Sequence, residues 1–225
     1  MRIIASPGIF EVDLVFPRNA TYTPQALTPI VWALQNPSSN QGSPGSVSDG
    51  LIELNEQMTS NELFLVSDFV NTIAYPNGHW TLLWTLEFYN CSQLSGNPTV
   101  YTRSDPTVFT ISNSGQEPDL LAATSADECG TMEAYAFNVT SFGEACGYLG
   151  PTPTTNPCAV TINSTATSSL YAAATASACS PWSRNANVTC PSVTSANKTA
   201  GQSRMATVPV LLMLLATVTN LIHLG

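Results

Sequence analysis

The sequence predicts a mainly β protein: an immunoglobulin-like β-sandwich with a small disulfide-stapled C-terminal appendage, followed by a disordered stalk and a hydrophobic tail. Three observations lead to this prediction. Short segments of alternating apolar and polar residues recur through the first two thirds of the chain, as in half-buried strands of a sandwich. All six cysteines lie at or after residue 91, and five of them lie in the second half of the chain. The 225 residues, 44% of them hydrophobic, suffice for one domain with a substantial core.

The first strand is expected around residues 10–16, with Glu11 and Asp13 facing water and the alternate apolar residues facing the core. Residues 30–34 are continuously apolar, which predicts a central strand. The clearest strand spans residues 80–88, because large apolar side chains there share one face: Trp80, Leu82, Trp84, Leu86 and Phe88. Further short strands are expected at residues 51–54, 63–66, 69–70, 99–102, 107–111 and 134–139.

Composition divides the chain into four parts. We expect the sandwich at residues 8–152 and a Cys-rich, Ala/Ser/Thr-rich appendage packed on it at residues 153–190. A Ser/Thr stalk and polar spacer follow at 191–207, and a hydrophobic tail at 208–225. Prolines make residues 151–157 a hinge or stiff linker, and residues 170–178 predict a short helix inside the appendage.

The cysteines favour three disulfides, because their number is even and no CxxC pair of the zinc-binding kind is present. The alternative is a set of reduced, buried thiols. Their spacing leaves all fifteen pairings open. The six are Cys91, Cys129, Cys146, Cys158, Cys179 and Cys190.

Six Asn-x-Ser/Thr acceptor sites predict N-glycosylation in a secreted protein, although some arise by chance in a chain rich in these residues. They are Asn19, Asn90, Asn138, Asn163, Asn187 and Asn197.

The tail predicts a signal for a glycosylphosphatidylinositol (GPI) anchor. An uncharged apolar run starts at Val208, and a polar spacer of the required length separates it from small residues. The candidate attachment residues are Ser195, Asn197 and Gly201. The alternatives are a C-terminal membrane helix or a buried terminal helix. An anchored protein enters the secretory pathway, so we expect a signal peptide that is missing from this sequence. A cytosolic tail-anchored protein is the rival interpretation.

The net charge and the number of histidines disfavour several classes of function. Six basic against 15 acidic residues, a net charge of −9, disfavour nucleic-acid binding. Only His79 and His223 exist, so neither a metal site nor a cofactor is predicted, and a Ser-His-Asp triad would depend on His79. We expect His79 in a surface turn and no catalytic residue.

Two further activities stay open as alternatives. A glycan-active hydrolase needs two carboxylates, and the acids available include Glu53, Asp68, Asp127 and Glu128, with Glu87 the first to test. A carbohydrate-binding module needs an exposed aromatic ring that stacks on sugar. Trp182, in a Ser-Pro-Trp-Ser loop, is the better ligand candidate, although we expect that it packs against a disulfide. Trp80 and Trp84 are expected in the core.

The opening Gly8-Ile-Phe-Glu-Val-Asp-Leu-Val-Phe-Pro-Arg-Asn-Ala-Thr-Tyr22, followed by Thr28-Pro-Ile-Val-Trp32, resembles a family of uncharacterised fungal secreted domains, domain of unknown function 7136. The similarity extends from Gly8 to about Cys190. The resemblance implies secretion, often a C-terminal anchor, and no assigned activity or site. We therefore expect an extracellular, GPI-anchored surface or wall glycoprotein with a structural or adhesive role, whose partners are the membrane and wall polysaccharide.

Overall fold

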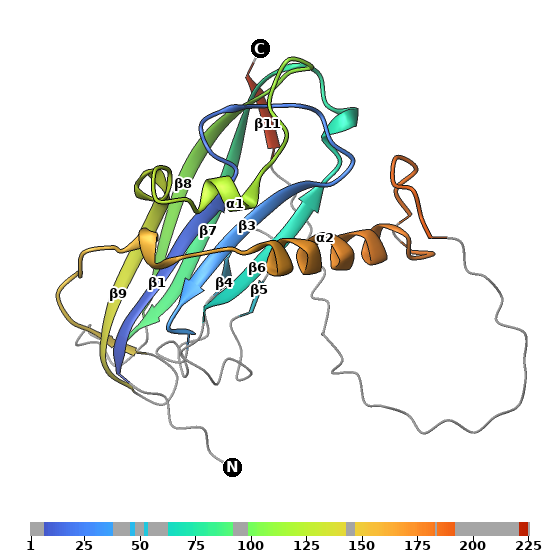
Figure 1. Ribbon diagram of the computed structural model, residues 1–225. Coiled ribbons are helices and arrows are strands. Elements are labelled where there is room, and N and C mark those ends of the chain that lie inside the picture. Colours follow the sequence, from blue (N-terminus) through green and yellow to red (C-terminus); the bar gives the residue numbers. More distant parts are fainter. Residues whose placement is uncertain are drawn as a thin grey trace, which may run out of the picture.

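A computed structural model (Figure 1) describes residues 7–37, 46–47, 52–53, 63–91, 99–142, 147–182, 184–191 and 221–224. The strands are β1 (Gly8–Phe16), β2 (Thr21–Tyr22), β3 (Thr28–Gln35), β4 (Ser46–Val47), β5 (Ile52–Glu53), β6 (Phe64–Val70), β7 (Gly78–Asn90), β8 (Thr99–Ile111), β9 (Glu133–Phe142), β10 (Gly147–Leu149) and β11 (Leu221–Leu224). The α-helices are α1 (Leu120–Ala123) and α2 (Ser164–Ala178), and short 3-10 turns are η2 (Thr72–Ala74), η3 (Cys129–Thr131) and η4 (Pro157–Ala159).

The strands form two antiparallel sheets, which confirms the predicted mainly β sandwich. One sheet has the order β6-β3-β1-β9, and the other pairs β7 with β8 along 13 residues. Short strands extend the second sheet: β2 lies on β8, whereas β4 and β11 lie on β7. Strand β10 pairs with both β9 and β7, so the two sheets are joined along one side.

The core between the sheets follows the predicted alternation. Trp84 from β7 packs against Trp32 from β3 and Tyr135 from β9, with ring centroids 6.4 and 5.5 Å apart. The apolar residues of β1 and β7 that were expected on one face are buried there: Phe10, Val12, Leu14, Phe16, Trp80, Leu82, Trp84 and Leu86. The side chain of Phe88 lies outside the described residues. Large aromatic rings from both sheets therefore fill the space between them.

The prediction that Glu11 and Asp13 face water is wrong, since both are buried, with 3% and 0% of their surface exposed. The outer face of the β1 sheet carries a third layer, made by α1, α2 and residues 150–163 (Figure 1). Val160 and Ile162 in this layer are themselves fully buried. Strand β1 therefore has both faces covered, which an alternating pattern cannot predict.

Helix α2 begins at Ser164, six residues earlier than expected. Asn163 caps it, because its side-chain oxygen accepts a hydrogen bond from the Ala166 N–H at 2.8 Å. The helix docks on the edge strand of the first sheet, where the rings of Tyr171 and Phe69 meet at 5.2 Å. This contact holds the appendage against the sandwich.

Two pairs of predicted strands are each one strand in the structure. Strand β6 covers both 63–66 and 69–70, because its backbone pairs with β3 without interruption from Phe64 to Val70. Strand β8 covers both 99–102 and 107–111, and it runs through Pro106, which lies opposite Leu83 of β7. Backbone pairing with a long neighbour therefore continues past polar residues and a proline that suggest a break in the sequence.

The disulfides staple the appendage as predicted. Cys129–Cys158 links the sandwich to the appendage, and Cys179–Cys190 closes a loop after α2. Cys91 is also disulfide-bonded, and its partner lies outside the described residues, as Cys146 does.

Residues 192–220, which include most of the expected stalk and tail, lie outside the described residues. The last described segment, β11, pairs antiparallel with β7 at residues 79–82. None of the helices in the described part of the chain has the length and apolar character needed to cross a membrane.

Candidate functional site

Glu11 and Asp13, here called the acidic pair, lie two residues apart on the covered face of β1. Alternation along a strand puts both side chains on the same face. Their cross-strand neighbours are small or neutral: Ala33 and Gln35 on β3, and Ala134 and Ala136 on β9. The alanines leave room for the third layer to approach the sheet closely. Two carboxyl groups are thereby enclosed between β1 and the segment that follows Gly150.

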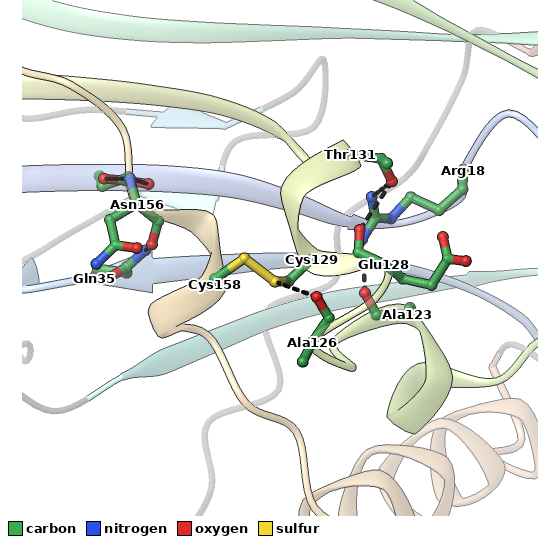
Figure 2. Close-up of a disulfide and its surroundings, with 10 residues drawn as sticks. Arg18, Gln35, Ala123, Ala126, Glu128, Cys129, Thr131, Asn156 and Cys158 are labelled. Atoms are coloured by element: carbon green, nitrogen blue, oxygen red, sulfur yellow. Dashed lines mark hydrogen bonds between the residues drawn. A yellow bond between two sulfur atoms is a disulfide. The ribbon is translucent and has the colours of Figure 1, made fainter.

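Each member of the acidic pair is connected to Asn156 of the covering segment, Glu11 directly and Asp13 through Gln35. The backbone N–H of Asn156 donates to both carboxylate oxygens of Glu11, at 2.7 and 3.0 Å. The Gln35 amide donates to Asp13 Oδ2 at 2.9 Å and to the Asn156 carbonyl at 3.0 Å. Figure 2 shows Gln35 reaching Asn156 beside η4. Asn156 is therefore held by its N–H and its carbonyl at once.

The environment of Asp13 favours its neutral form. The pKa of Asp13 is raised to about 8, mainly by burial; the nearby Glu11 adds to the rise, whereas the hydrogen bond from Gln35 and the charge of Arg18 oppose it. Asp13 Oδ1 is buried and has no hydrogen-bond partner among the described residues. These influences therefore favour the protonated form of Asp13 at neutral pH.

Arg18, which follows β1, holds the other side of the third layer. Its guanidinium donates to the carbonyls of Val15 and Ala123, at 2.8 and 2.6 Å, and to Thr131 Oγ1 at 2.8 Å. Burial lowers the pKa of Arg18, and Tyr22, Glu128 and Asp13 oppose that shift. The side chain thus connects the end of β1 to α1 and η3.

The Cys129–Cys158 disulfide lies between these two sets of contacts (Figure 2). It joins η3, which Arg18 contacts through Thr131, to η4, which follows Asn156. The acidic pair, Arg18 and the disulfide therefore hold the same layer at neighbouring points.

The acidic pair contacts segments of the same protein, and a substrate has no access to it. A glycosidase needs two carboxyl groups that a saccharide can reach, with room for water or a covalent intermediate between them. The acidic pair is buried and covered by Asn156. Its chemistry in this structure is the docking of the third layer.

Glu133 is a second carboxylate group with several partners, and its role was not predicted from the sequence. Its Oε2 accepts hydrogen bonds from Thr107 Oγ1 at 2.8 Å and from the Trp84 indole at 3.3 Å, and its Oε1 accepts one from the Tyr135 hydroxyl at 3.3 Å. These partners come from β7, β8 and β9, so Glu133 ties the two sheets together. The sequence signal for this contact was the spacing of Glu133 and Tyr135, which lie two residues apart on one strand.

Trp182 is the sequence-predicted ligand candidate that the structure leaves accessible. The expectation that it packs against a disulfide is wrong, because 96% of its surface is exposed. It lies in the loop closed by Cys179–Cys190, here called the disulfide loop. The same loop borders an open hollow of about 710 Å³, whose lining includes Thr175 and Ala176 of α2 and Arg184. An exposed indole thus shares a covalently closed loop with one wall of a surface hollow.

The other catalytic candidates are dispersed. His79 is exposed at the start of β7, and its Nδ1 lies 2.9 Å from Thr110 Oγ1. Asp68 lies in β6, whereas Asp127 and Glu128 lie in the turn before η3. The side chains of Glu87 and Glu53 lie outside the described residues. Across the described ranges, no three His, Cys, Asp or Glu residues are grouped so that they could hold a metal ion.

The predicted glycosylation sites differ in accessibility. Asn19, Asn163 and Asn187 are exposed, whereas Asn138 in β9 and Asn90 at the end of β7 are partly buried. Asn163 uses its oxygen as the α2 cap, which leaves its amide nitrogen for a sugar. Asn197, Ser195 and Gly201 lie outside the described residues.

Comparison with known proteins gives one match. A family model described as a domain of unknown function, DUF7136, matches residues 5–190. No curated protein and no solved structure has a significant match to the chain. The match includes the acidic pair, Arg18, both described disulfides and the disulfide loop. The chain therefore belongs to the DUF7136 family of domains of unknown function.

Proposed function

We propose that this protein is an extracellular, GPI-anchored glycoprotein of the fungal cell surface or wall, with a structural or adhesive role and no catalytic activity. The observation that supports this proposal best is the oxidised state of the cysteines: both described disulfides clamp the appendage, and Cys91 is bonded as well. Disulfides of this kind persist in oxidising, extracellular compartments. The exposed acceptor sites Asn19, Asn163 and Asn187 also agree with secretion.

Enzymatic release from intact cells tests the anchor. The chain is expressed behind a cleavable secretory leader in a yeast host, and intact cells are treated with phosphatidylinositol-specific phospholipase C. We expect a released glycoprotein that shifts in electrophoretic mobility after deglycosylation and has no free thiols. The matched control replaces Ser195, Asn197 and Gly201 with leucine, which blocks attachment because the transamidase requires small residues, and it should yield no lipase-released protein.

The same experiment can contradict the proposal. Retention of the wild-type protein in membranes after lipase treatment, together with free thiols and no glycan shift, would identify a cytosolic tail-anchored protein. Release of the control variant to the same extent as the wild type would show that the anchor is attached elsewhere.

A second candidate function, binding of wall polysaccharide, is favoured by the exposure of Trp182. Tryptophan is usually buried, and a fully exposed indole is costly unless it meets a partner. The Cys179–Cys190 bond restrains the loop, so a ligand would lose less conformational freedom on binding. Arg184 and the hollow beside α2 supply polar and apolar surface in the same region.

Replacement of the indole tests glycan binding. We expect Trp182→Ala to lower affinity for insoluble β-glucan or chitin at least tenfold in a pull-down assay, because stacking on one sugar is lost. Trp182→Phe keeps an aromatic face and should retain most of the binding. Equal binding by the wild type and the alanine variant would contradict a role for Trp182.

A further inference from the structure

The acidic pair has one buried carboxylate oxygen that needs a hydrogen-bond donor or a positive charge beside it. Asp13 is fully buried, and its Oδ2 accepts from Gln35 while its Oδ1 has no partner in the described part of the chain. Both oxygens of Glu11 already accept from the Asn156 N–H. A buried carboxylate oxygen without a donor is destabilising, and two unpaired negative charges side by side are more so.

The described residues that lie opposite the acidic pair or cover it are neutral. Strand β3 contributes Ala33 and the neutral Gln35, and β9 contributes Ala134 and Ala136 opposite the pair. The covering segment contributes Asn156. Helix α1, with the sequence Leu-Leu-Ala-Ala, contributes no titratable group.

Among the described residues, Arg18 is the cation that acts on Asp13, and its guanidinium already donates to other groups. It donates to the carbonyls of Val15 and Ala123 and to Thr131. Tyr22 and Glu128 are the titratable groups that act on Arg18 from the other side. The neighbouring Cys129–Cys158 bond does not titrate. A proton is therefore the cation that can supply the missing positive charge at Asp13 Oδ1.

We propose that the acidic pair is a proton-binding site, in which a proton on Asp13 Oδ1 is shared with Glu11 and keeps the Asn156 segment docked on β1. The proton turns Asp13 Oδ1 from an acceptor without a donor into a donor toward Glu11. Glu11 then keeps its oxygens for the Asn156 N–H. When the proton leaves, two buried carboxylates face each other and repel, and the contact with Asn156 weakens.

The direction of the pH effect follows from linkage. Asp13 titrates near its ordinary value of 3.8 in the unfolded chain and near 8 in the folded protein. Because the folded pKa is the higher one, the folded state holds a proton that the unfolded chain has released between these values. The contribution of Asp13 to stability is greatest below about pH 4 and is lost as the pH rises through 8.

A substitution that mimics the protonated state tests this proposal. Asp13→Asn keeps the shape of the side chain and a permanent donor. We expect the ratio of its folding constant to that of the wild type to rise about tenfold per pH unit between pH 4.5 and 7.5, measured by urea unfolding at constant ionic strength. The exposed Asp127→Asn is the matched control and should give a ratio that varies less than threefold.

The wild-type protein provides a second, independent measurement if Asp13→Asn does not fold. The side-chain carboxyl 13C resonance of Asp13 should titrate with a midpoint near 8. Hydrogen exchange of the Asn156 amide, corrected for its intrinsic rate, should be protected at pH 5 and lose protection above pH 8. A midpoint below 5, or a ratio for Asp13→Asn that stays within threefold across the pH range, would overturn the proposal.

Discussion

Replacing Trp84 with alanine is expected to lower the free energy of unfolding by about 3–5 kcal/mol, the range observed when a large aromatic side chain is removed from a core. Trp84 is 2% exposed, and its ring contacts Trp32 and Tyr135. Its indole N–H also donates to Glu133 Oε2 at 3.3 Å. The substitution leaves a cavity between the sheets and removes a donor from a partly buried carboxylate group. Urea unfolding followed by circular dichroism measures the loss.

The matched control is Trp182→Ala, which removes the same side chain from a position that is 96% exposed. It should change the free energy of unfolding by less than about 0.5 kcal/mol, as surface substitutions usually do. Similar losses from both substitutions would mean that Trp182 is packed in solution, and this would also remove the main support for glycan stacking.

Removing the Cys129–Cys158 disulfide, as Cys129→Ala with Cys158→Ala, is expected to cost about 3–4 kcal/mol. The bond closes a loop with a sequence separation of 29, and the stabilisation by a disulfide rises with the loop it closes. The acidic pair and Arg18 alone would then hold the third layer on the sheet. Thermal or urea unfolding under oxidising conditions measures the effect, and limited proteolysis should show earlier cleavage within residues 151–163.

The control for this prediction is the removal of the other described disulfide, Cys179–Cys190. This bond spans a separation of only 11 and lies after α2, so its loss should cost about 2–3 kcal/mol on the same model and leave residues 151–163 protected. If that segment became equally sensitive to protease in both variants, the role assigned to Cys129–Cys158 in holding the third layer would be incorrect.

The motif that opens the domain is a docking surface within the chain. Glu11 binds Asn156, Asp13 binds Gln35, and Arg18 binds segments near α1 and η3. Charged residues in a specific motif often indicate a catalytic site, but here each one contacts a part of the same protein. Any contact with another molecule would therefore be made by exposed parts such as the disulfide loop.

Several features of the fold could be predicted from the sequence alone. Alternation identified β1 and β7, and the continuous apolar run identified β3 as a central strand, because apolar residues mark the face of a strand that packs against the core. The even set of cysteines indicated disulfides, and the Ser-Pro-Trp-Ser sequence indicated that Trp182 lies in a loop. These signals are local, so a short window of sequence contains them.

Only the tertiary structure decided what covers the outer face of β1. Alternation suggested that Glu11 and Asp13 face water, whereas they face Asn156, a residue 145 positions away from Glu11. The pairing of Cys129 with Cys158 and the partners of Glu133 are likewise set by segments far apart in the chain. The sequence by itself determined the positions of the main strands β1, β3 and β7 and indicated that cysteines pair. The third layer, and with it the burial of the acidic pair, depended on long-range packing, because a polar residue has the same local pattern whether water or another segment satisfies it.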